Sequence, residues 1–495
     1  MKKWKLTLKI FIILLTAFLI VGCDKKDQYE TETILDQREF KAVWISSFIN
    51  EVPYEDKEQF ITYMEGVFEV LVYYGINALI FHVRTHNNAF YQSNINPLAS
   101  WFSTVDFAEF DPLEWVIEES HKRGIEFHAW LNPYRVGEYY VGDYPSENPA
   151  SNPNNIIDGK ILNPALENVR QHLYNTIIEL VDNYDVDAIH FDDYFYIQTD
   201  ASPTSASARR ENINILIEGI HNLLKEYNKN NNRYIQFGIS PTGIYKNGNG
   251  IVNYDQDGKP LTTGSANTRG FEHYGNYLYA DTVKWISEGW LDYLIPQVYW
   301  ARDTKAAPFE SVLSWWDKVV KHLDINLYSG IGVYMADENR DGWGSNTSEL
   351  DEQFKIIENK LSNVKGYSIF SYKHLNNGYI NSSLKSGYQI RKAYRDEMRR
   401  KIKVPPIISS MTPVILPEVK NLVLQDGFLK WDGVNGAKFY YIYAAEALTY
   451  SNSEIVAVVY SKEATVEFLI DSELANLEYG VRALSYTNHL SPISD

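Results

Sequence analysis

Two adjacent carboxylates close an apolar run in the segment Asp187–Tyr194, whose residues are DAIHFDDY. Carboxylates that follow a buried strand are costly unless they take part in chemistry or pair with a cation. Hydrolysis of a glycosidic bond needs one ionised carboxylate and one protonated carboxyl group. We therefore expect Asp192 to be the ionised group, with Arg84 holding its pKa down. The alternative is that Asp192 forms a structural ion pair with Arg84 or Arg135 while Asp193 caps the next loop.

The protonated carboxyl group must come from a second residue that lies near Asp192. Another apolar run ends at Trp300, and Asp303 lies just beyond it, so Asp303 is the first candidate for the acid. The alternative for Asp303 is a solvated loop residue paired with Arg302, because carboxylates are common in loops. Further candidates for the acid are Asp193, Glu138 and Asp337.

Polar and aromatic side chains accompany these carboxylates at the ends of several apolar runs. Side chains alternate between the two faces of a strand, so the polar set opposes Phe81, Leu131 and Phe191 and should face inward. Aromatic faces stack on sugar rings and amides bond hydroxyl groups, although core packing claims most aromatic residues. The candidate substrate-binding residues are Arg84, His82, His128, Asn132, Tyr134, Arg135, His190, Tyr194, Gln297, Tyr299, Trp300 and Trp343.

Four histidines favour a rival hypothesis, in which the protein is a metal-dependent hydrolase. They are His82, His86, His128 and His190. Metal-dependent amidohydrolase barrels typically begin with a His-x-His pair on the first strand, whereas this chain has Trp44-Ile-Ser-Ser there. Barrel histidines more often hydrogen-bond carboxylates. We therefore expect neither a metal nor another cofactor.

The elements that must position these residues repeat as a short β-rich run, a polar loop and a helical stretch. Eight such units predict a (β/α)₈ barrel over residues 38–402, whose active site lies at the carboxyl ends of the strands. A doubly wound sheet is the alternative, but no glycine-rich phosphate fingerprint follows the first strand. The predicted strands are Lys41–Phe48, Ala78–Thr85, Glu126–Asn132, Ala188–Tyr194, Gln236–Ser240, Tyr293–Trp300, Leu327–Tyr334 and Gly366–Tyr372. The predicted helices are Lys57–Tyr73, Pro112–Lys122, Glu167–Asn183, Asn212–Tyr227, Asp281–Glu288, Phe309–His322, Glu349–Lys360 and Ser383–Arg400.

Proline-rich sequence over residues 403–417 breaks the helical periodicity and predicts a linker. Short alternating strands with Asp-Gly and Asn-Gly turns then fill residues 418–495, which predicts a small β-sandwich. The series from Trp431 to Tyr443, followed by Tyr479–Ser485, resembles a fibronectin type III domain.

The chain begins with a basic start and an apolar run from Ile10 to Val21, which is typical of an export signal over residues 1–22. The tetrad that ends at Cys23 matches the bacterial lipobox, so we expect Cys23 to be acylated and residues 23–37 to form a tether. The expected location is the extracytoplasmic face of the cell membrane, or the outer membrane. Cys23 is the only cysteine, so no disulfide can form within the chain.

The amino-acid composition limits the classes of partner that this protein can bind. The formal net charge of −18 disfavours binding to nucleic acid, whose phosphates would be repelled. Hydrophobic residues make up 45% of the chain, which is enough for a large core. We expect a monomer that meets a polysaccharide substrate and is held at a membrane by its lipid.

The barrel resembles the glycosyl hydrolase-like 10 family of exported bacterial proteins. The matching stretches run in order along the barrel: Ala42–Ile45, Phe127–Arg135, Leu162–Pro164, Asp187–Tyr196, Phe237–Pro241, Leu278–Asp281, Pro296–Trp300 and Phe370–Lys373. The resemblance implies a glycosidase associated with peptidoglycan glycan strands, particularly strands without peptides. Carried over by position, it marks the pocket residues Arg84, Asn132, Arg135, Asp192, Asp193, Gln297 and Trp300. One position departs from the family pattern, because Asn88 stands where the family usually has aspartate.

These observations predict a lipid-anchored glycoside hydrolase that uses two carboxyl groups on a wall or related amino-sugar polymer. A carbohydrate-binding barrel without activity is the alternative, and Asn88 favours it mildly. Replacing Asp192 with asparagine separates the two, because an enzyme loses turnover while a binding protein does not.

Overall fold

The computed structural model describes residues 38–494 apart from short gaps at 49–51, 53–55, 199–203, 267, 341, 447, 449–452, 472–473 and 475. The expected signal (1–22), the acylated Cys23 and the tether (23–37) lie outside the described residues. Within the part of the chain that is described, no helix has the length and apolar character needed to cross a membrane.

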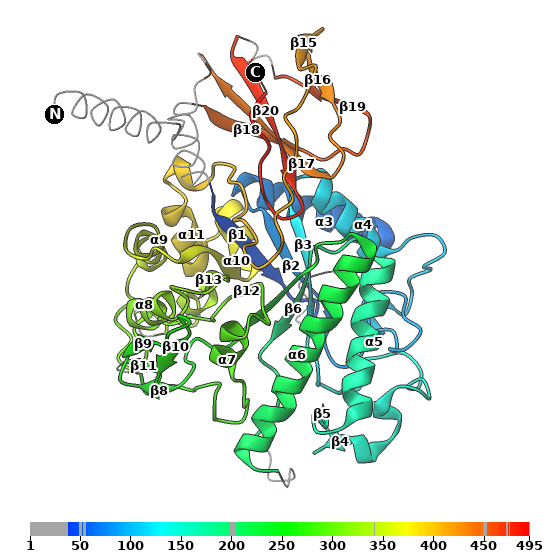
Figure 1. The fold of residues 1–495 in the computed structure, drawn as a ribbon, viewed down its shortest axis with the longest axis vertical. Coiled ribbons are helices and arrows are strands. Elements are labelled where there is room, and N and C mark those ends of the chain that lie inside the picture. The colour runs from blue at the N-terminus through cyan, green and yellow to red at the C-terminus, as the bar shows by residue number, and fades with distance from the viewer. Residues whose placement is uncertain are drawn as a thin grey trace, which may run out of the picture.

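Eight parallel strands form a closed barrel with the order β1-β14-β13-β12-β7-β6-β3-β2 (Figure 1). The predicted (β/α)₈ fold is therefore confirmed. The barrel strands are β1 (Phe40–Ile45), β2 (Ala78–Arg84), β3 (Glu126–Leu131), β6 (Ala188–Asp192), β7 (Gln236–Ser240), β12 (Tyr293–Leu294), β13 (Asn326–Gly332) and β14 (Val364–Phe370). Their inward side chains, including Trp44, Trp130 and Tyr293, form a buried cluster of their own inside the barrel.

Helices surround the barrel and follow its strands in sequence. They are α3 (Lys57–Tyr73), α4 (Pro112–Lys122), α5 (Glu167–Asn183), α6 (Ala206–Asn231), α7 (Thr282–Ser287), α8 (Phe309–Val319), α9 (Glu349–Lys360), α10 (Tyr372–Tyr379) and α11 (Lys385–Ala393). Local chemistry explains several starts. The side chain of Asp56 caps α3, and Asp111 caps α4 just before Pro112, whose missing N–H has no role at a first helical position.

Several predicted elements have different bounds in the structure, among them the sixth strand and the last helix. The sixth strand ends at Leu294 instead of Trp300, because Pro296 has no N–H to continue the ladder. Only an isolated bridge pair at Gln297 continues its direction, toward Thr242 and Gly330. The helix predicted over 383–400 is α11, which ends at Ala393 and is followed by a short 3₁₀ turn at Glu397–Arg399.

Loops on the C-terminal side of the barrel carry small strands of their own. They are β4 (Ile156–Ile157), β5 (Ile161–Leu162), β8 (Asn247–Gly248), β9 (Val252–Tyr254), β10 (Pro260–Thr262) and β11 (Ser265–Ala266). The pairs β4-β5, β9-β10 and β8-β11 stiffen the long loops that follow β3 and β7.

The C-terminal domain consists of two three-stranded antiparallel sheets, β15-β16-β19 and β18-β17-β20. Their strands are β15 (Val423–Gln425), β16 (Phe428–Asp432), β17 (Ala437–Ala445), β18 (Glu454–Val459), β19 (Thr465–Leu469) and β20 (Glu478–Ser485). Residues of both sheets, including Trp431, Tyr440 and Val481, share one buried core. The small all-β domain is thus present, while its fibronectin type III identity stays a prediction.

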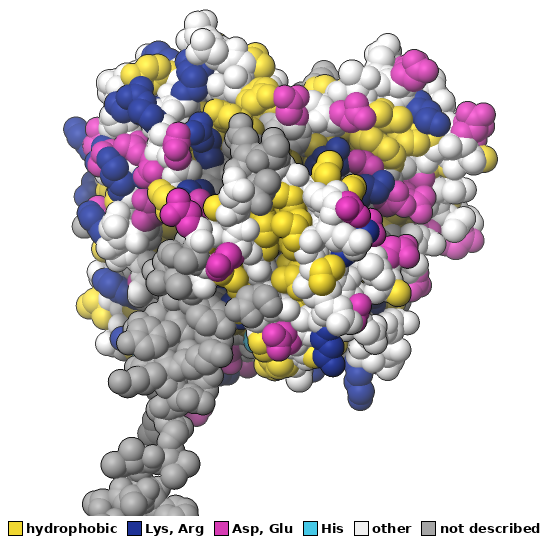
Figure 2. Space-filling model, turned by 90° about the horizontal axis from the view of Figure 1, so that it is seen from above, with side chains coloured by type: hydrophobic (Ala, Val, Ile, Leu, Met, Phe, Trp, Pro, Cys, Tyr) yellow, Lys and Arg dark blue, Asp and Glu magenta, His cyan; other side chains and the backbone are white. Residues whose placement is uncertain are grey.

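This domain docks on the amino ends of the barrel strands, at the end opposite the expected active site (Figure 1). Lys438 of β17 is buried, and its Nζ lies 2.7 Å from both Glu126 at the start of β3 and Asp187 just before β6. The linker residue Ile407 also accepts a hydrogen bond from Asn326. Seen from the domain's end, the molecule shows charges of both signs around hydrophobic patches (Figure 2).

Candidate active site

Asp192 and Asp193 lie side by side where β6 reaches the C-terminal end of the barrel. Oδ1 of Asp192 accepts hydrogen bonds from the backbone N–H of Asp193 (2.7 Å) and from Nε2 of Gln297 (2.9 Å). Oδ2 of Asp193 accepts from the backbone N–H of Thr242 (2.7 Å), and the two carboxyl groups also contact each other. Both residues are only 7% exposed. The sequence-predicted residues Asp192, Asp193 and Gln297 therefore meet at one point.

The two carboxyl groups prefer different protonation states. Burial raises the pKa of Asp192, and the Asp193 amide, Arg135 and Gln297 counter this by favouring the ionised form. Burial raises the pKa of Asp193 well above its ordinary value, and the neighbouring charge of Asp192 adds to the rise. Like charges in contact cannot both ionise easily. We therefore assign the carboxylate to Asp192 and the proton to Asp193, on Oδ1 because Oδ2 accepts from Thr242.

Arg135 and Tyr194 form the partly open side of this pair. The guanidinium of Arg135 lies 3.5 Å from the ring centroid of Tyr194, in a cation–π contact. Tyr194 is 37% exposed, and the charge of Asp192 together with burial raises its pKa to about 12. Among the described residues, no carboxylate lies within 4 Å of the Arg135 guanidinium, so this cation is held by an aromatic ring instead of an acid.

Two clusters of aromatic side chains flank these residues. Neither cluster was predicted from the sequence. Tyr299, whose pKa is raised by burial and by Asp192, contacts Tyr334 and Phe370 at ring separations of 5.9 and 6.0 Å. On the loops after β1 to β3, Phe48 contacts His86 and Tyr139 at 4.6 and 5.2 Å. Each of these residues follows or ends a barrel strand, which is the signal that could have identified them.

The histidines at the barrel axis form a hydrogen-bonded column below the carboxylates. Tyr293 OH lies 3.0 Å from Nδ1 of His190 and 2.9 Å from Nδ1 of His128. Nε2 of His128 lies 3.2 Å from Glu126, at the amino end of the strands. His190 and His128 are fully buried, so both belong to the barrel core and support the site from below. His82 also lies inside the barrel, where its ring stacks on Trp130 at 3.8 Å.

Arg84 does not hold the pKa of Asp192 down, which corrects the sequence expectation. The register between β2 and β3 shifts between His82 and Arg84, so the alternation of faces is interrupted there. The guanidinium donates to the carbonyl oxygens of Asn132 and Pro133 and to the side chains of Asn87 and Asn96. Asn96 and Asn87 in turn contact Thr176 and His172 of α5. Arg84 is thus a fully buried structural cation that ties loops to the helix layer.

Three other predicted binding residues are also buried, with their contacts inside the protein. Asn132 accepts from the Trp130 indole and donates to the backbone of Thr85. Tyr134 is fully buried in the cluster between the strands and helices. Trp343 is 1% exposed and donates to the carbonyl oxygen of Tyr299, so it positions an aromatic neighbour and offers no open face. Trp300 is partly exposed and its ring lies against Gly243 in the loop after β7.

Asp303 lies away from the carboxylate pair's hydrogen-bond network. It is an exposed residue of the turn after Ala301, where Gly342 lies against its carboxylate. Arg302 bonds to Glu349 at the start of α9 and not to Asp303, so the alternative in which Asp303 pairs with Arg302 is not seen either. The structure therefore favours Asp193 over Asp303 as the proton-bearing group.

Asn88, the departure from the family pattern, acts within its own loop. Its Oδ1 accepts from the backbone N–H groups of Thr85 and His86, and its Nδ2 donates to the carbonyl oxygen of Tyr139. An aspartate would keep the first two bonds and lose the third, because a carboxylate cannot donate. Asn88 therefore shapes the loop that carries His86 and ties it to the loop after β3 that carries Tyr139.

In the described ranges, no group of three or more histidine, cysteine, aspartate or glutamate residues is arranged to hold a metal ion. His128 and His190 instead share Tyr293 as a common partner.

Comparisons with known proteins identify a matching family and several similar proteins. The glycosyl hydrolase-like 10 family model matches residues 39–207 and 198–343. Glycosyl hydrolase YngK of Bacillus subtilis (strain 168) is 32% identical over 372 residues, which cover 68% of this chain and 69% of that protein. Glycosyl hydrolase DigH of Escherichia coli (strain K12) is 30% identical over 342 residues, covering 61% and 73%. The glycoside hydrolase domain of PgaB (BpsB) from Bordetella bronchiseptica aligns with a TM-score of 0.44 at 12% identity, covering 69% and 96%. The chain therefore belongs to the glycosyl hydrolase-like 10 family.

Proposed function

We propose that the chain is an exported, lipid-anchored glycoside hydrolase that cleaves an amino-sugar polysaccharide of the bacterial wall, such as a peptidoglycan glycan strand. The observation that carries the proposal is the buried Asp192–Asp193 pair at one strand end, where hydrogen bonds and Arg135 favour the ionised form of Asp192 while burial and the charge of Asp192 favour the protonated form of Asp193. This is the pairing of states that glycosidic hydrolysis requires. Membership of the family and the names of its relatives support the class of reaction.

The contact between the two carboxyl groups sets the mechanism we propose. Enzymes that use two carboxyl groups on opposite sides of the bond hold them at least about 5 Å apart, which exceeds hydrogen-bond contact. Asp193 therefore protonates the leaving oxygen, and the 2-acetamido group of the substrate attacks the anomeric carbon. Asp192 stays ionised and stabilises the positive charge that develops on the acetamido group. Water then opens the cyclic intermediate, and its proton returns to Asp193.

Arg135 supports an acidic sugar as part of the substrate. Its guanidinium lies beside the carboxylate pair and has no acidic partner among the described residues. Arginine binds carboxylates through two parallel hydrogen bonds. A glycan strand without peptides carries a free carboxylate on its lactyl group, and a strand with peptides does not. We therefore propose that Arg135 favours strands from which the peptides have been removed.

The test is digestion of purified wall glycans, with and without their peptides, followed by mass analysis of the released fragments. We expect the unacylated chain to release disaccharide-based fragments from the peptide-free strands. Asp192→Asn and Asp193→Asn should abolish this release while both variants still bind the strands. If neither substrate yields fragments and the unsubstituted chain nevertheless binds them, the protein is a carbohydrate-binding barrel and the proposed hydrolysis is wrong.

A further inference from the structure

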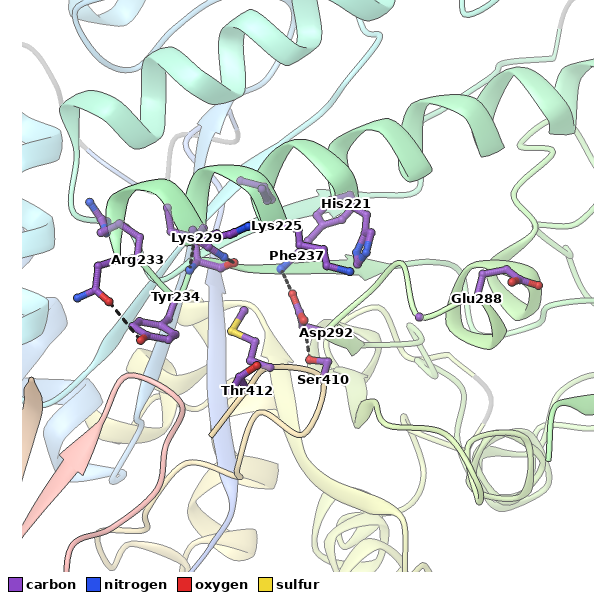
Figure 3. A pocket seen from close by; sticks show the side chains of 16 residues that line it. His221, Lys225, Lys229, Arg233, Tyr234, Phe237, Glu288, Asp292, Ser410 and Thr412 are labelled. Atoms are coloured by element: carbon purple, nitrogen blue, oxygen red, sulfur yellow. Dashed lines mark hydrogen bonds between the residues drawn. The ribbon is translucent and has the colours of Figure 1, made fainter. Parts of the chain in front are cut away.

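A cavity lies at the opposite end of the barrel from the carboxylate pair. It has a volume of about 600 Å³, within the usual range for sites that hold small molecules. Its walls are the last turns of α6, the turn between α7 and β12, and linker residues 410–412 (Figure 3). Phe237 at the start of β7 and Asp292 just before β12 lie at its floor, so the cavity opens at the amino ends of the strands.

Basic side chains dominate one wall of this cavity although the chain as a whole is acidic. Lys225 and Lys229 stand on successive turns at the end of α6, and Arg233 follows the end of the helix (Figure 3). Arg233 is paired with Asp185 at 2.9 Å. The ammonium groups of Lys225 and Lys229 have no carboxylate within 4 Å in the described part of the chain. The cavity therefore presents two uncommitted positive charges.

The acidic residues of the cavity are already satisfied by other groups. Glu288 pairs with Lys259 at 2.9 Å. Asp292 accepts from the backbone N–H of Phe237 (2.7 Å) and from the hydroxyl of Ser410 (2.6 Å). These bonds fix the linker against the barrel and leave the two lysines without an acidic counterpart. A ligand that supplies the missing negative charge would complete the site.

We propose that this cavity binds a glycerophosphate group, and that its source is the headgroup of an anionic membrane lipid. Lysines bind phosphate as flexible point charges, and the volume exceeds what a bare phosphate ion fills. The remaining space is lined by polar groups such as Asn232, Tyr234 and Thr412, which suit the hydroxyl groups of a glycerol unit.

The position of the cavity favours a lipid over a soluble ester. Arg38, the first described residue, lies at the same end of the barrel, where it bonds to the carbonyl oxygen of Pro405 in the linker. Residues 24–37 span at most roughly 50 Å when fully extended. If Cys23 is acylated, as proposed above, the membrane lies within that reach of this end. The bound headgroup would then hold the barrel with its carboxylate pair turned away from the membrane.

The test measures binding of the unacylated chain from residue 24 onward, which contains the whole described fold. Three probes are used: vesicles of phosphatidylglycerol, vesicles of phosphatidylcholine, and free glycerol 3-phosphate. We expect binding to phosphatidylglycerol vesicles and to glycerol 3-phosphate, and none to phosphatidylcholine. Lys225→Ala/Lys229→Ala should weaken vesicle binding about 30-fold, because each lysine near an anionic surface contributes about 1 kcal/mol.

A control pair keeps the measurement specific to the cavity. Lys321 and Lys420 are exposed and do not line it, so Lys321→Ala/Lys420→Ala should change vesicle binding less than about twofold. Glycan hydrolysis should be unchanged in both double variants, which separates this proposal from the proposed activity. Equal loss in the two double variants, or no binding of either phosphate probe, would overturn the site. Binding of glycerol 3-phosphate without vesicle binding would overturn the membrane source.

Discussion

At the scale of single residues, the site depends on the different surroundings of two neighbouring carboxyl groups. Asp192 receives an amide hydrogen bond, a glutamine hydrogen bond and the field of Arg135, which together favour its charge. Asp193 has the charge of Asp192 beside it and is equally buried. Such separation of protonation states is how one site supplies both an acid and a carboxylate.

The pH dependence of hydrolysis should reflect the pKa values of Asp192 and Asp193. Activity needs Asp192 ionised, so it falls as the pH drops through the pKa of Asp192. It also needs Asp193 protonated, so it falls as the pH rises through the pKa of Asp193, which is raised well above the usual value. A profile of kcat/KM against pH should therefore be bell-shaped, with an alkaline limb far above the range of an ordinary aspartate.

Substitution distinguishes the carboxyl groups. Asp192→Asn and Asp193→Asn should each lower kcat by at least about 100-fold, the usual contribution of a positioned acid or base. Asp303→Asn is the matched control and should keep nearly full activity, because Asp303 is exposed and outside the pair's hydrogen-bond network. A loss in Asp303→Asn comparable to that in Asp193→Asn would return the acid role to Asp303.

Arg135 should act on substrate choice and on the acid limb together. Arg135→Gln is expected to raise KM about tenfold for peptide-free strands and to leave KM for neutral N-acetylglucosamine oligomers nearly unchanged. The acid limb should move to higher pH, because Arg135 lowers the pKa of Asp192. Arg340→Gln, at an exposed arginine paired with Glu338, is the control. Equal changes in KM for both substrates would contradict a role in binding a carboxylate.

At the scale of the elements, a local irregularity of β2 decides which side chains reach the site. The register shift between His82 and Arg84 keeps His82 inside the barrel and turns Arg84 toward α5. A one-residue shift moves a side chain to the other face of a strand. The strand end thus provides a buried anchor for the following loops, which carry His86, Asn88 and Tyr139.

Replacing Arg84 should lower the stability of the fold more than it affects catalysis. Arg84→Met should lower the free energy of unfolding by about 3 kcal/mol, since it leaves buried carbonyl and amide oxygens without a donor. Arg135→Met, at a partly exposed arginine, should cost less than about 1 kcal/mol. Urea unfolding followed by tryptophan fluorescence measures both. Similar losses in the two variants would show that Arg84 is no more structural than Arg135.

At the scale of the whole molecule, the C-terminal domain is part of the barrel's amino end. Lys438 enters a buried group that also contains Glu126, Asp187 and His121. Burial would raise the pKa of Asp187, but Lys438 and His121 outweigh it and hold this pKa below its ordinary value. The same two carboxylates raise the pKa of Lys438 above its ordinary value despite burial. The domain therefore supplies the counter-charge for two acids of the barrel.

Removing that counter-charge should destabilise the barrel as well as the domain contact. Lys438→Met should lower the free energy of unfolding by about 3–5 kcal/mol at neutral pH, because it leaves buried carboxylates without a cation. The stabilisation from Asp187 is present above its unfolded pKa of about 4 and is lost as the pH falls through the lower folded pKa. The difference between the variant and the unsubstituted chain should therefore narrow below about pH 4.

The control for this prediction is Lys462→Met, which removes an exposed lysine 3.5 Å from Asp185 at the same interface. Its effect should stay below about 1 kcal/mol, as is usual for exposed pairs. Urea unfolding at several pH values measures both variants. If the two substitutions cost the same, the buried group contributes nothing specific to the docking.

The barrel could be predicted from the sequence because hydrophobic periodicity is a local property that repeats eight times. That Asp192, Asp193 and Gln297 lie together could also be predicted, because the carboxyl ends of parallel strands meet at one end of a barrel. Tertiary structure alone decided that Arg84 turns outward, that Trp343 is buried and that Asp303 lies apart. Strict alternation cannot predict a shift in register, and distance along the chain does not give distance in space. The pairing of Lys438 with Glu126 and Asp187 joins residues hundreds of positions apart, so only the docked domains bring those charges together.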